Sequence, residues 1–159
     1  LSVEDAYCAI PHRRTVFDTD AAKMSAEEKR FLAALFGLVD EAIVARVTRT
    51  QWIVSGGRKG AATSRHDEIL STLRELSVPR SLESVHRLVS EAIREQADFL
   101  DEVGRKIPVT KEQIRQHPTV RSASRKLHGA YAELMRRFRH EEAHNKQAFF
   151  DYLCALDFI

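Results

Sequence analysis

Residues 81–104 have the sequence SLESVHRLVSEAIREQADFLDEVG, in which apolar residues return every three or four positions. This spacing gathers them on one face of an α-helix, whereas a half-buried strand would alternate strictly. The apolar positions are Val85, Leu88, Val89, Ala92, Ile93, Phe99, Leu100 and Val103. Ser81 is placed to cap the start of this helix, and Gly104 is placed to end it. The stretch therefore predicts an amphipathic helix that buries one face.

The sequence before this stretch predicts two further helices with the same period. Ser25 and Glu28 have the spacing of a capping box, and apolar residues recur behind them over residues 26–54. A shorter periodic pattern covers residues 64–77 and is closed by Pro79. A long and a short helix are expected here.

The sequence after it predicts one more long helix. A second capping box begins at Thr110 and starts a helix of at most two turns. Pro118 then suits the first turn of a longer helix over residues 119–155. Such a helix would span ~55 Å, which is long for a globular protein. A bend at Gly129 or near Glu141 is therefore expected.

Strand-like alternation bounded by turn dipeptides does not occur in the chain, and the joints between the periodic segments are short. Short joints favour antiparallel neighbours. The predicted fold class is all-α, an antiparallel up-down-up-down bundle of four main helices. Residues 1–24 are expected to form an N-terminal arm packed on the bundle, and residues 25–159 the bundle domain.

Composition favours one folded domain in a reducing compartment. The 159 residues are 43% apolar and 30% charged, as in ordinary globular proteins. The two cysteines, Cys8 and Cys154, are too few and too far apart for a disulfide framework, so a cytoplasmic location is expected, with one bridge between the chain ends as the alternative. No apolar run approaches the ~20 residues needed to cross a bilayer, so membrane insertion is not expected.

Positive charge is concentrated late in the chain, although the net charge is only +2. Residues 103–140 carry ten basic and two acidic side chains. The regularly placed basic residues are Arg115, Arg121, Arg125, Lys126, Arg136, Arg137 and Arg139. The 105–139 segment could contact phosphates, but few aromatic residues interleave with it. Weak nucleic-acid binding is therefore a second alternative function, less favoured than a solvated face paired with acidic neighbours.

A zinc-like motif occurs in the last predicted helix. His140 and His144 match the H-E-x-x-H pattern, in which two imidazoles on one helical face hold zinc. Helical phase directs both of them toward solvent, and no histidine follows as a third ligand. A zinc hydrolase is therefore disfavoured.

A di-metal site is the first alternative function. Glu83 with His86, and Glu141 with His144, have the Glu-x-x-His spacing of carboxylate-bridged iron or manganese bundles with redox or oxygen chemistry. Two further carboxylates, from Glu41 and Glu75, would complete the set. Helical phase opposes this site because it turns Glu83 away from the core.

A polar layer inside the bundle is the main candidate site. Glu142 and Asn145 fall on the apolar face of the last predicted helix, and Arg46 falls on that of the first. An unpaired buried charge is costly, so an Arg46–Glu142 pair bridged by Asn145 is expected. Gln96 is expected to line the same interior. The layer would either fix the register of the helices or line a pocket that orients a small ligand.

Other features favour binding over catalysis. No nucleophile motif occurs in the sequence, and Arg13 and Arg14 on the arm could grip a carboxylate or phosphate. Some apolar residues lie outside the main apolar stripe, or core-facing side, of their predicted helices and could form a partner-facing or self-associating surface: Phe36, Val47, Phe150 and Phe158. The sequence therefore predicts a non-enzymatic helical-bundle binding module for a protein partner, a second copy, or a small anionic or polar ligand.

Overall fold

The computed structural model describes residues 17, 23–106 and 109–158, and over these residues the fold is all-α without strands. Six α-helices are present in this part of the chain, with a short 3₁₀ turn, η1, at Arg80–Leu82. The helices are α2 (Ala26–Val54), α3 (His66–Glu75), α4 (Glu83–Gly104), α5 (Lys111–Gln116), α6 (Pro118–Arg137) and α7 (Ala143–Leu156). The predicted all-α class is confirmed.

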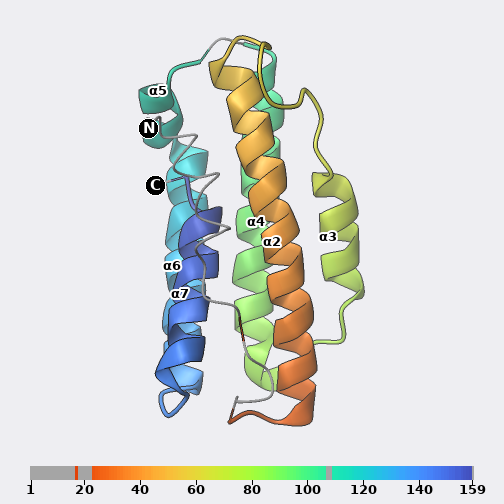
Figure 1. The fold of residues 1–159 in the computed structure, drawn as a ribbon, viewed down its shortest axis with the longest axis vertical. Coiled ribbons are helices and arrows are strands. Elements are labelled where there is room, and N and C mark those ends of the chain that lie inside the picture. The colour runs from red at the N-terminus through yellow and green to blue at the C-terminus, as the bar shows by residue number, and fades with distance from the viewer. Residues whose placement is uncertain (1–16, 18–22, 107–108, 159) are drawn as a thin grey trace.

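The long helices pack side by side with nearly aligned axes (Figure 1). α4 packs against α2 and α6, and α7 packs against α2 and α6. α3 lies on the outer side of α2 and α4, away from α6 and α7. The chain reverses direction from α2 to α3, α4, α6 and then α7 (Figure 1). The main buried cluster draws residues from α2, α3, α4, α6 and α7.

The start of α2 is as the sequence predicts. Ser25 Oγ accepts from the Glu28 N–H at 3.1 Å, and Glu28 Oε1 accepts from the Ser25 N–H at 3.1 Å. This reciprocal pair satisfies two backbone donors that the first turn leaves without a helical partner. Behind the cap, Leu32, Leu35 and Val39 are fully buried in the core. The predicted helix over 26–54 is confirmed at both ends.

The single long helix predicted over residues 119–155 is wrong. α6 ends at Arg137, the chain turns over residues 138–142, and α7 runs back along α6. The reversal lets α7 bury Phe149 and Leu153 in the core, whereas a straight helix would carry them beyond the first turn of α2, outside the bundle. The bend expected near Glu141 is therefore a full reversal.

Two predicted helix ends have different physical roles. Ser81 does not cap α4, which begins after η1 without a side-chain cap. The Ser81 hydroxyl instead donates to Glu28 Oε2 at 2.9 Å. Gly104 ends α4 without a left-handed conformation. A Cβ at Gly104 would lie 2.6 Å from Nη2 of Arg49, so glycine leaves room for that guanidinium.

The apolar residues predicted to face a partner are mostly in the core. Phe36, Val47 and Phe158 are buried, because α7 and the end of the chain cover positions that lie off the main stripes. Phe150 alone of the four is exposed, at 48%. Most of the predicted arm, including residues 1–16, lies outside the described residues, but Phe17 packs against Phe36 with ring centroids 5.4 Å apart. In the part of the chain that the structure describes, no helix has the length and apolar character to cross a membrane.

Candidate functional site

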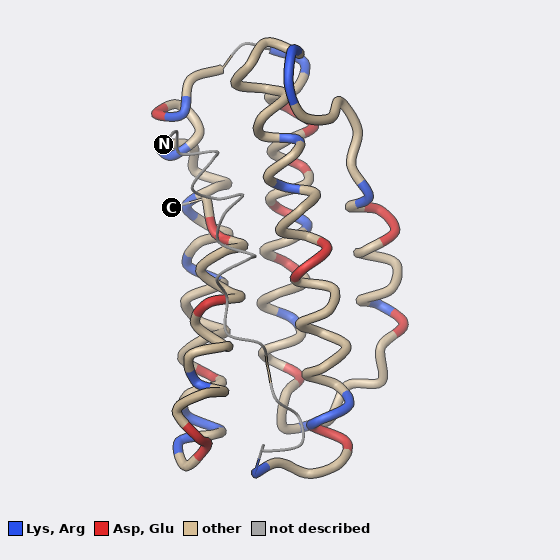
Figure 2. The backbone as a smooth tube through the Cα atoms, viewed as in Figure 1, with Lys and Arg blue, Asp and Glu red and all other residues tan. Residues whose placement is uncertain are grey.

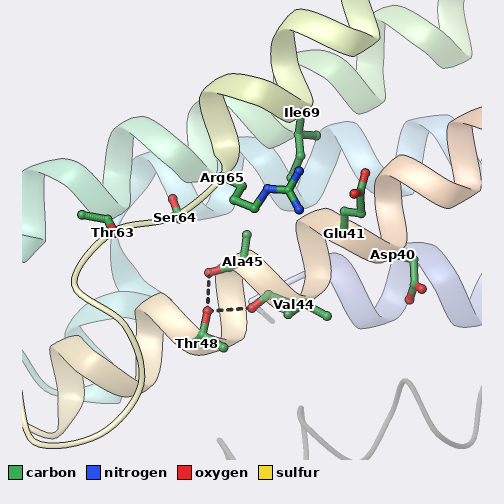
Figure 3. A pocket seen from close by; sticks show the side chains of 9 residues that line it. All are labelled: Asp40, Glu41, Val44, Ala45, Thr48, Thr63, Ser64, Arg65 and Ile69. Carbon is green, nitrogen blue, oxygen red and sulfur yellow. Dashed lines mark hydrogen bonds between the residues drawn. The ribbon is translucent and has the colours of Figure 1, made fainter.

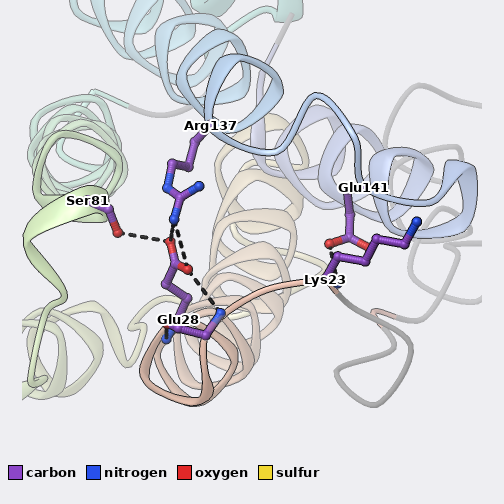
Figure 4. Close-up of polar contacts among 6 residues, drawn as sticks. Lys23, Glu28, Ser81, Arg137 and Glu141 are labelled. Atoms are coloured by element: carbon purple, nitrogen blue, oxygen red, sulfur yellow. Dashed lines mark hydrogen bonds and ion pairs between the residues drawn. The ribbon is translucent and has the colours of Figure 1, made fainter.

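A polar cluster closes the end of the bundle where α2 and η1 begin (Figure 4). Glu28 is 3% exposed and receives hydrogen bonds from the Ser25 N–H, from Ser81 Oγ and from Arg137 Nη2. Burial alone would raise the pKa of Glu28, but these hydrogen bonds and the Arg137 charge outweigh it and lower that pKa. Protein donors from three segments satisfy this carboxylate, which supports a structural role for the cluster.

The predicted Arg46–Glu142 ion pair is wrong. Arg46 is fully buried, but its Nη2 donates to the Ala155 carbonyl at 3.0 Å and its guanidinium lies 4.8 Å from the ring centroid of Phe158. Glu142 is exposed at the opposite end of α7, ~20 Å away along the helix. The prediction fails because it carried the phase of α6 through the turn at residues 138–142.

The polar layer nevertheless exists, and it caps α7. Gln96 is 1% exposed and its Nε2 donates to the Leu156 carbonyl at 2.8 Å, one residue beyond the carbonyl bound by Arg46. The last carbonyls of a helix lack helical partners and carry partial negative charge, so these two donors satisfy and neutralise them. The contacts support the structural interpretation of the layer over a ligand pocket.

Another predicted binding residue, Asn145, lies apart from Arg46. Asn145 is 1% exposed but lies in the first turn of α7, near the turn at residues 138–142. Arg13 and Arg14 lie outside the described residues. The proposed ligand set of Arg46, Glu142 and Asn145 is therefore not brought together.

The predicted metal ligands are also not gathered. Glu83 and His144 are exposed, and His86 Nε2 lies 2.8 Å from the Leu73 carbonyl. Glu141 is buried, but its carboxylate accepts from the backbone N–H groups of Lys23 at 2.7 Å and Glu142 at 3.0 Å (Figure 4). Within the described ranges, no three His, Cys, Asp or Glu residues are grouped so that they could hold a metal ion. The zinc-like motif likewise fails, because His140 lies in the turn instead of in a helix.

One hollow of about 300 Å³ lies between α2 and the chain that leads into α3 (Figure 3). Its floor includes Val44, which is 54% exposed, and Ile69. Arg65 reaches over it from the start of α3 and pairs with Glu68 at 2.9 Å, and the nearby Glu41 charge helps to raise the Arg65 pKa. Asp40 and Glu41 against Arg65 give the lining of this hollow a formal charge of −1, so it does not favour an anionic ligand.

A second hollow, of about 450 Å³, opens between α5 and α6. We call it the arginine basin, and it is lined by Glu112, Arg115, Gln116, Arg121, Ser124, Arg125 and His128. Pro118 in the first turn of α6 and the extended residue His117 before it turn α5 against α6. His117 Nδ1 accepts from the Thr119 N–H at 3.2 Å, which fixes the start of α6. This corner brings Arg115 of α5 beside the α6 arginines.

Lys and Arg residues recur along α5 and α6 (Figure 2), but several of them are already paired with glutamates. Lys126 pairs with Glu91 and Glu95 of α4, Arg136 with Glu133, and Arg137 with Glu28. By contrast, within the described part of the chain Arg115, Arg121 and Arg125 are exposed and make no ion pair or hydrogen bond. With His128 neutral, three arginines against Glu112 give the lining of the basin a formal charge of +2. The basin is therefore a preformed cationic surface.

A buried carboxylate supports the edge of the basin. Asp157 is 4% exposed, and its Oδ2 accepts from Ser124 Oγ at 2.7 Å and lies 3.6 Å from His128 Nε2. These contacts join the residue that follows α7 to the middle of α6. They hold Ser124 and His128 in place and direct the Asp157 charge toward them.

A third hollow, of about 140 Å³, begins on the other side of His128, between α6 and α7. We call it the aromatic slot, and it is lined by Leu127, His128, Tyr131, Phe150, Leu153, Cys154 and Asp157. The rings of Tyr131 and Phe150 meet edge to face, with centroids 5.8 Å apart. Burial, and then the carboxylates of Asp157 and Asp151, raise the pKa of the Cys154 thiol. The basin and the slot share His128 and so adjoin each other at this residue.

Sequence reasoning missed this surface as a site. Its arginines belong to the basic segment that the sequence singled out, but nothing in their spacing separates them from Lys126 or Arg137. Their lack of acidic partners depends on where α2 and α4 place their glutamates. The slot could not be predicted at all, since it requires the reversal between α6 and α7.

No protein-family model matches the chain, and the searches of curated proteins and of solved structures likewise find no match. Function is therefore inferred from the geometry of the site.

Proposed function

We propose that the protein is a non-enzymatic binding module that holds a small oxyanion, a phosphate or carboxylate group, in the arginine basin. In this proposal α2, α4, α6 and α7 act as one four-helix bundle that carries the basin. The observation on which it depends is the convergence of Arg115, Arg121 and Arg125 on one hollow without acidic partners among the described residues. A guanidinium binds carboxylate and phosphate oxygens through paired N–H donors, so three of them favour one compact anion.

Nucleic acid is the second candidate ligand, and the basic segment supports it. A nucleic-acid backbone requires a row of contacts, each of which releases counterions. Beyond the basin, however, Lys126, Arg136 and Arg137 are already paired with glutamates. Arg139 has no glutamate partner among the described residues but lies in the turn at the far end of α6, so the available cations do not form a continuous row along that helix, which favours a small anion.

Two side chains near the basin support binding over catalysis. Ser124 is buried at 5% exposure and its hydroxyl proton is engaged in a hydrogen bond to the Asp157 carboxylate, so this serine is poorly accessible as a nucleophile. The raised pKa of Cys154 reduces its thiolate fraction, and the thiolate is the nucleophilic form. Neither group is prepared to attack a substrate.

The direct test is calorimetric titration of methyl phosphate into wild-type protein and single variants. Arg121→Gln and Arg125→Gln should each weaken binding about tenfold, since a hydrogen bond to a charged group contributes ~1.5 kcal/mol or more. Arg136→Gln is the matched control, because it removes an α6 arginine that is already paired with Glu133. Equal affinity in all four proteins would contradict the proposal.

A single-stranded oligonucleotide separates the two candidates. For a compact site, its affinity should match that of methyl phosphate and fall only weakly with added NaCl. A much tighter complex whose affinity falls steeply with salt would instead establish nucleic acid as the ligand.

A further inference from the structure

The aromatic slot adds an apolar compartment directly beside the arginine basin. Phe150 and Val44 are the two exposed large apolar side chains of the described residues, and each lies in a hollow. The hollow of Phe150 adjoins the positively charged basin, whereas the lining of the hollow of Val44 is formally negative, with Asp40 and Glu41 against Arg65. His128 forms part of the wall of both the slot and the basin.

The size and lining of the slot indicate what it accepts. Apolar cavities of about 150 Å³ bind benzene, and the slot measures about 140 Å³. Tyr131 and Phe150 present ring edges and faces at a centroid distance of 5.8 Å, an arrangement that a third ring can extend. One aromatic ring therefore fits the slot better than a long alkyl chain does.

Helix geometry places the two compartments within reach of one small molecule. Arg125 and Tyr131 are both on α6, six residues apart, which corresponds to ~9 Å along the helix axis. The arginine side chain is long and exposed, so its guanidinium can approach an anion held next to His128. A ring and an oxyanion joined by one or two bonds can contact both compartments.

We infer that the ligand is an aryl oxyanion, an aromatic ring that carries a phosphate or carboxylate group. The ring lies in the slot against Tyr131 and Phe150, and the oxyanion lies in the basin among the arginines. This inference rests on the proposed anion-binding function and adds the class of molecule that carries the anion.

Cys154 provides a readout inside the slot. Its thiol is free and exposed and lines the slot, so a ring bound there blocks access to it. In a Cys8→Ser variant Cys154 is the only thiol, and its alkylation by N-ethylmaleimide can be followed by mass spectrometry. Phenyl phosphate should slow this reaction, whereas methyl phosphate, with the same charge and no ring, should not.

Affinity gives the second readout. Phenyl phosphate should bind about tenfold or more tightly than methyl phosphate, because burying a ring removes its apolar surface from water. Phe150→Ala should abolish most of this preference, and Val44→Ala is the matched control, since it truncates the other exposed apolar residue in a different hollow. Because Cys154 protection is measured with Phe150 and Val44 intact, it does not depend on how either variant folds.

The outcomes separate the two proposals. Equal affinity for both phosphates without protection of Cys154 would overturn the aryl inference and leave anion binding intact. Absence of binding by either phosphate would overturn both. Protection by phenyl phosphate that persists in Arg121→Gln with unchanged affinity would show that the ring binds without the basin, and it would also overturn the inference.

Discussion

Arg137 Nη2 lies 3.1 Å from Oε1 and 2.9 Å from Oε2 of Glu28, so one guanidinium group joins the last turn of α6 to the first turn of α2. The two residues are 109 positions apart in the chain. Because Glu28 also caps its own helix and accepts from Ser81, this carboxylate connects three segments that meet at one end of the bundle.

Glu28→Gln should lower the free energy of unfolding by about 2 kcal/mol, since buried donors lose a charged acceptor. The pKa of Glu28 is lowered in the folded state, so its stabilising effect is complete above its ordinary pKa and is lost as the pH falls through the lowered value. Chemical denaturation at neutral and acidic pH measures both effects. Glu27→Gln, an exposed neighbour, is the control, and a loss of equal size in both variants would contradict the assigned role.

His66 should make stability fall between neutral pH and pH 5. Its side chain is buried, and this burial lowers its pKa below 6.5. The Asp101 and Asp67 charges oppose the shift, and weaker effects of Arg46 and Arg49 add to it. Below about pH 6.5 the unfolded chain therefore binds a proton that the folded chain resists, which favours unfolding.

The measurement for His66 is a series of thermal melts over this pH range. His66→Gln should flatten the dependence of Tm on pH, whereas His128→Gln, at an exposed histidine, should change it less. A wild-type Tm that is constant from pH 7 to pH 5 would refute the prediction.

Arg46→Met should cost about 1–3 kcal/mol, because the Ala155 carbonyl loses its buried donor. The loss should be concentrated in α7, which this contact caps. Urea denaturation gives the total, and Arg74→Met, at an exposed position on α3, provides the comparison. If both variants unfold at the same urea concentration, the cap contributes nothing.

Gly60→Ala should destabilise the protein far more than Gly56→Ala. Both glycines have positive φ, at 78° and 67°, and this alone costs an alanine ~1 kcal/mol. At Gly60 the new Cβ would also lie 2.1 Å from the Thr48 carbonyl oxygen, whereas at Gly56 nothing lies within 4 Å. Thermal melts measure the difference. If the Tm values of the two variants differ by less than the experimental error, the loop after α2 relaxes freely around the new side chain.

The sequence predicts the fold best where local signals act alone. The capping box at Ser25 and the stripe from Val85 to Val103 correctly indicate α2 and α4. The stripe argument also correctly places Arg46 in the interior, because helical phase is reliable within one continuous helix.

Prediction fails where a residue's neighbour is distant in the chain. Glu142 was assigned to the core by extending a helical phase through residues that in fact reverse the chain. The arginine basin depends on the pairing of Lys126 with α4 and of Arg137 with α2, and the slot depends on α7 packing against α6. Neither relationship is encoded in the spacing of the residues concerned.

The hydrogen bond between Ser124 and Asp157 joins α6 to the residue that follows α7 and so helps to hold the two helices together. The slot lies between α6 and α7, so it would be lost if α7 transiently detached from α6. The arginines of the basin would stay in place, because they all belong to α5 and α6. A molecule that contacts both compartments would bind fully only when α7 is packed against α6. Its binding would therefore stabilise the packing of α7 on α6. Amide hydrogens of α7 should then exchange more slowly with solvent deuterium when that molecule is present.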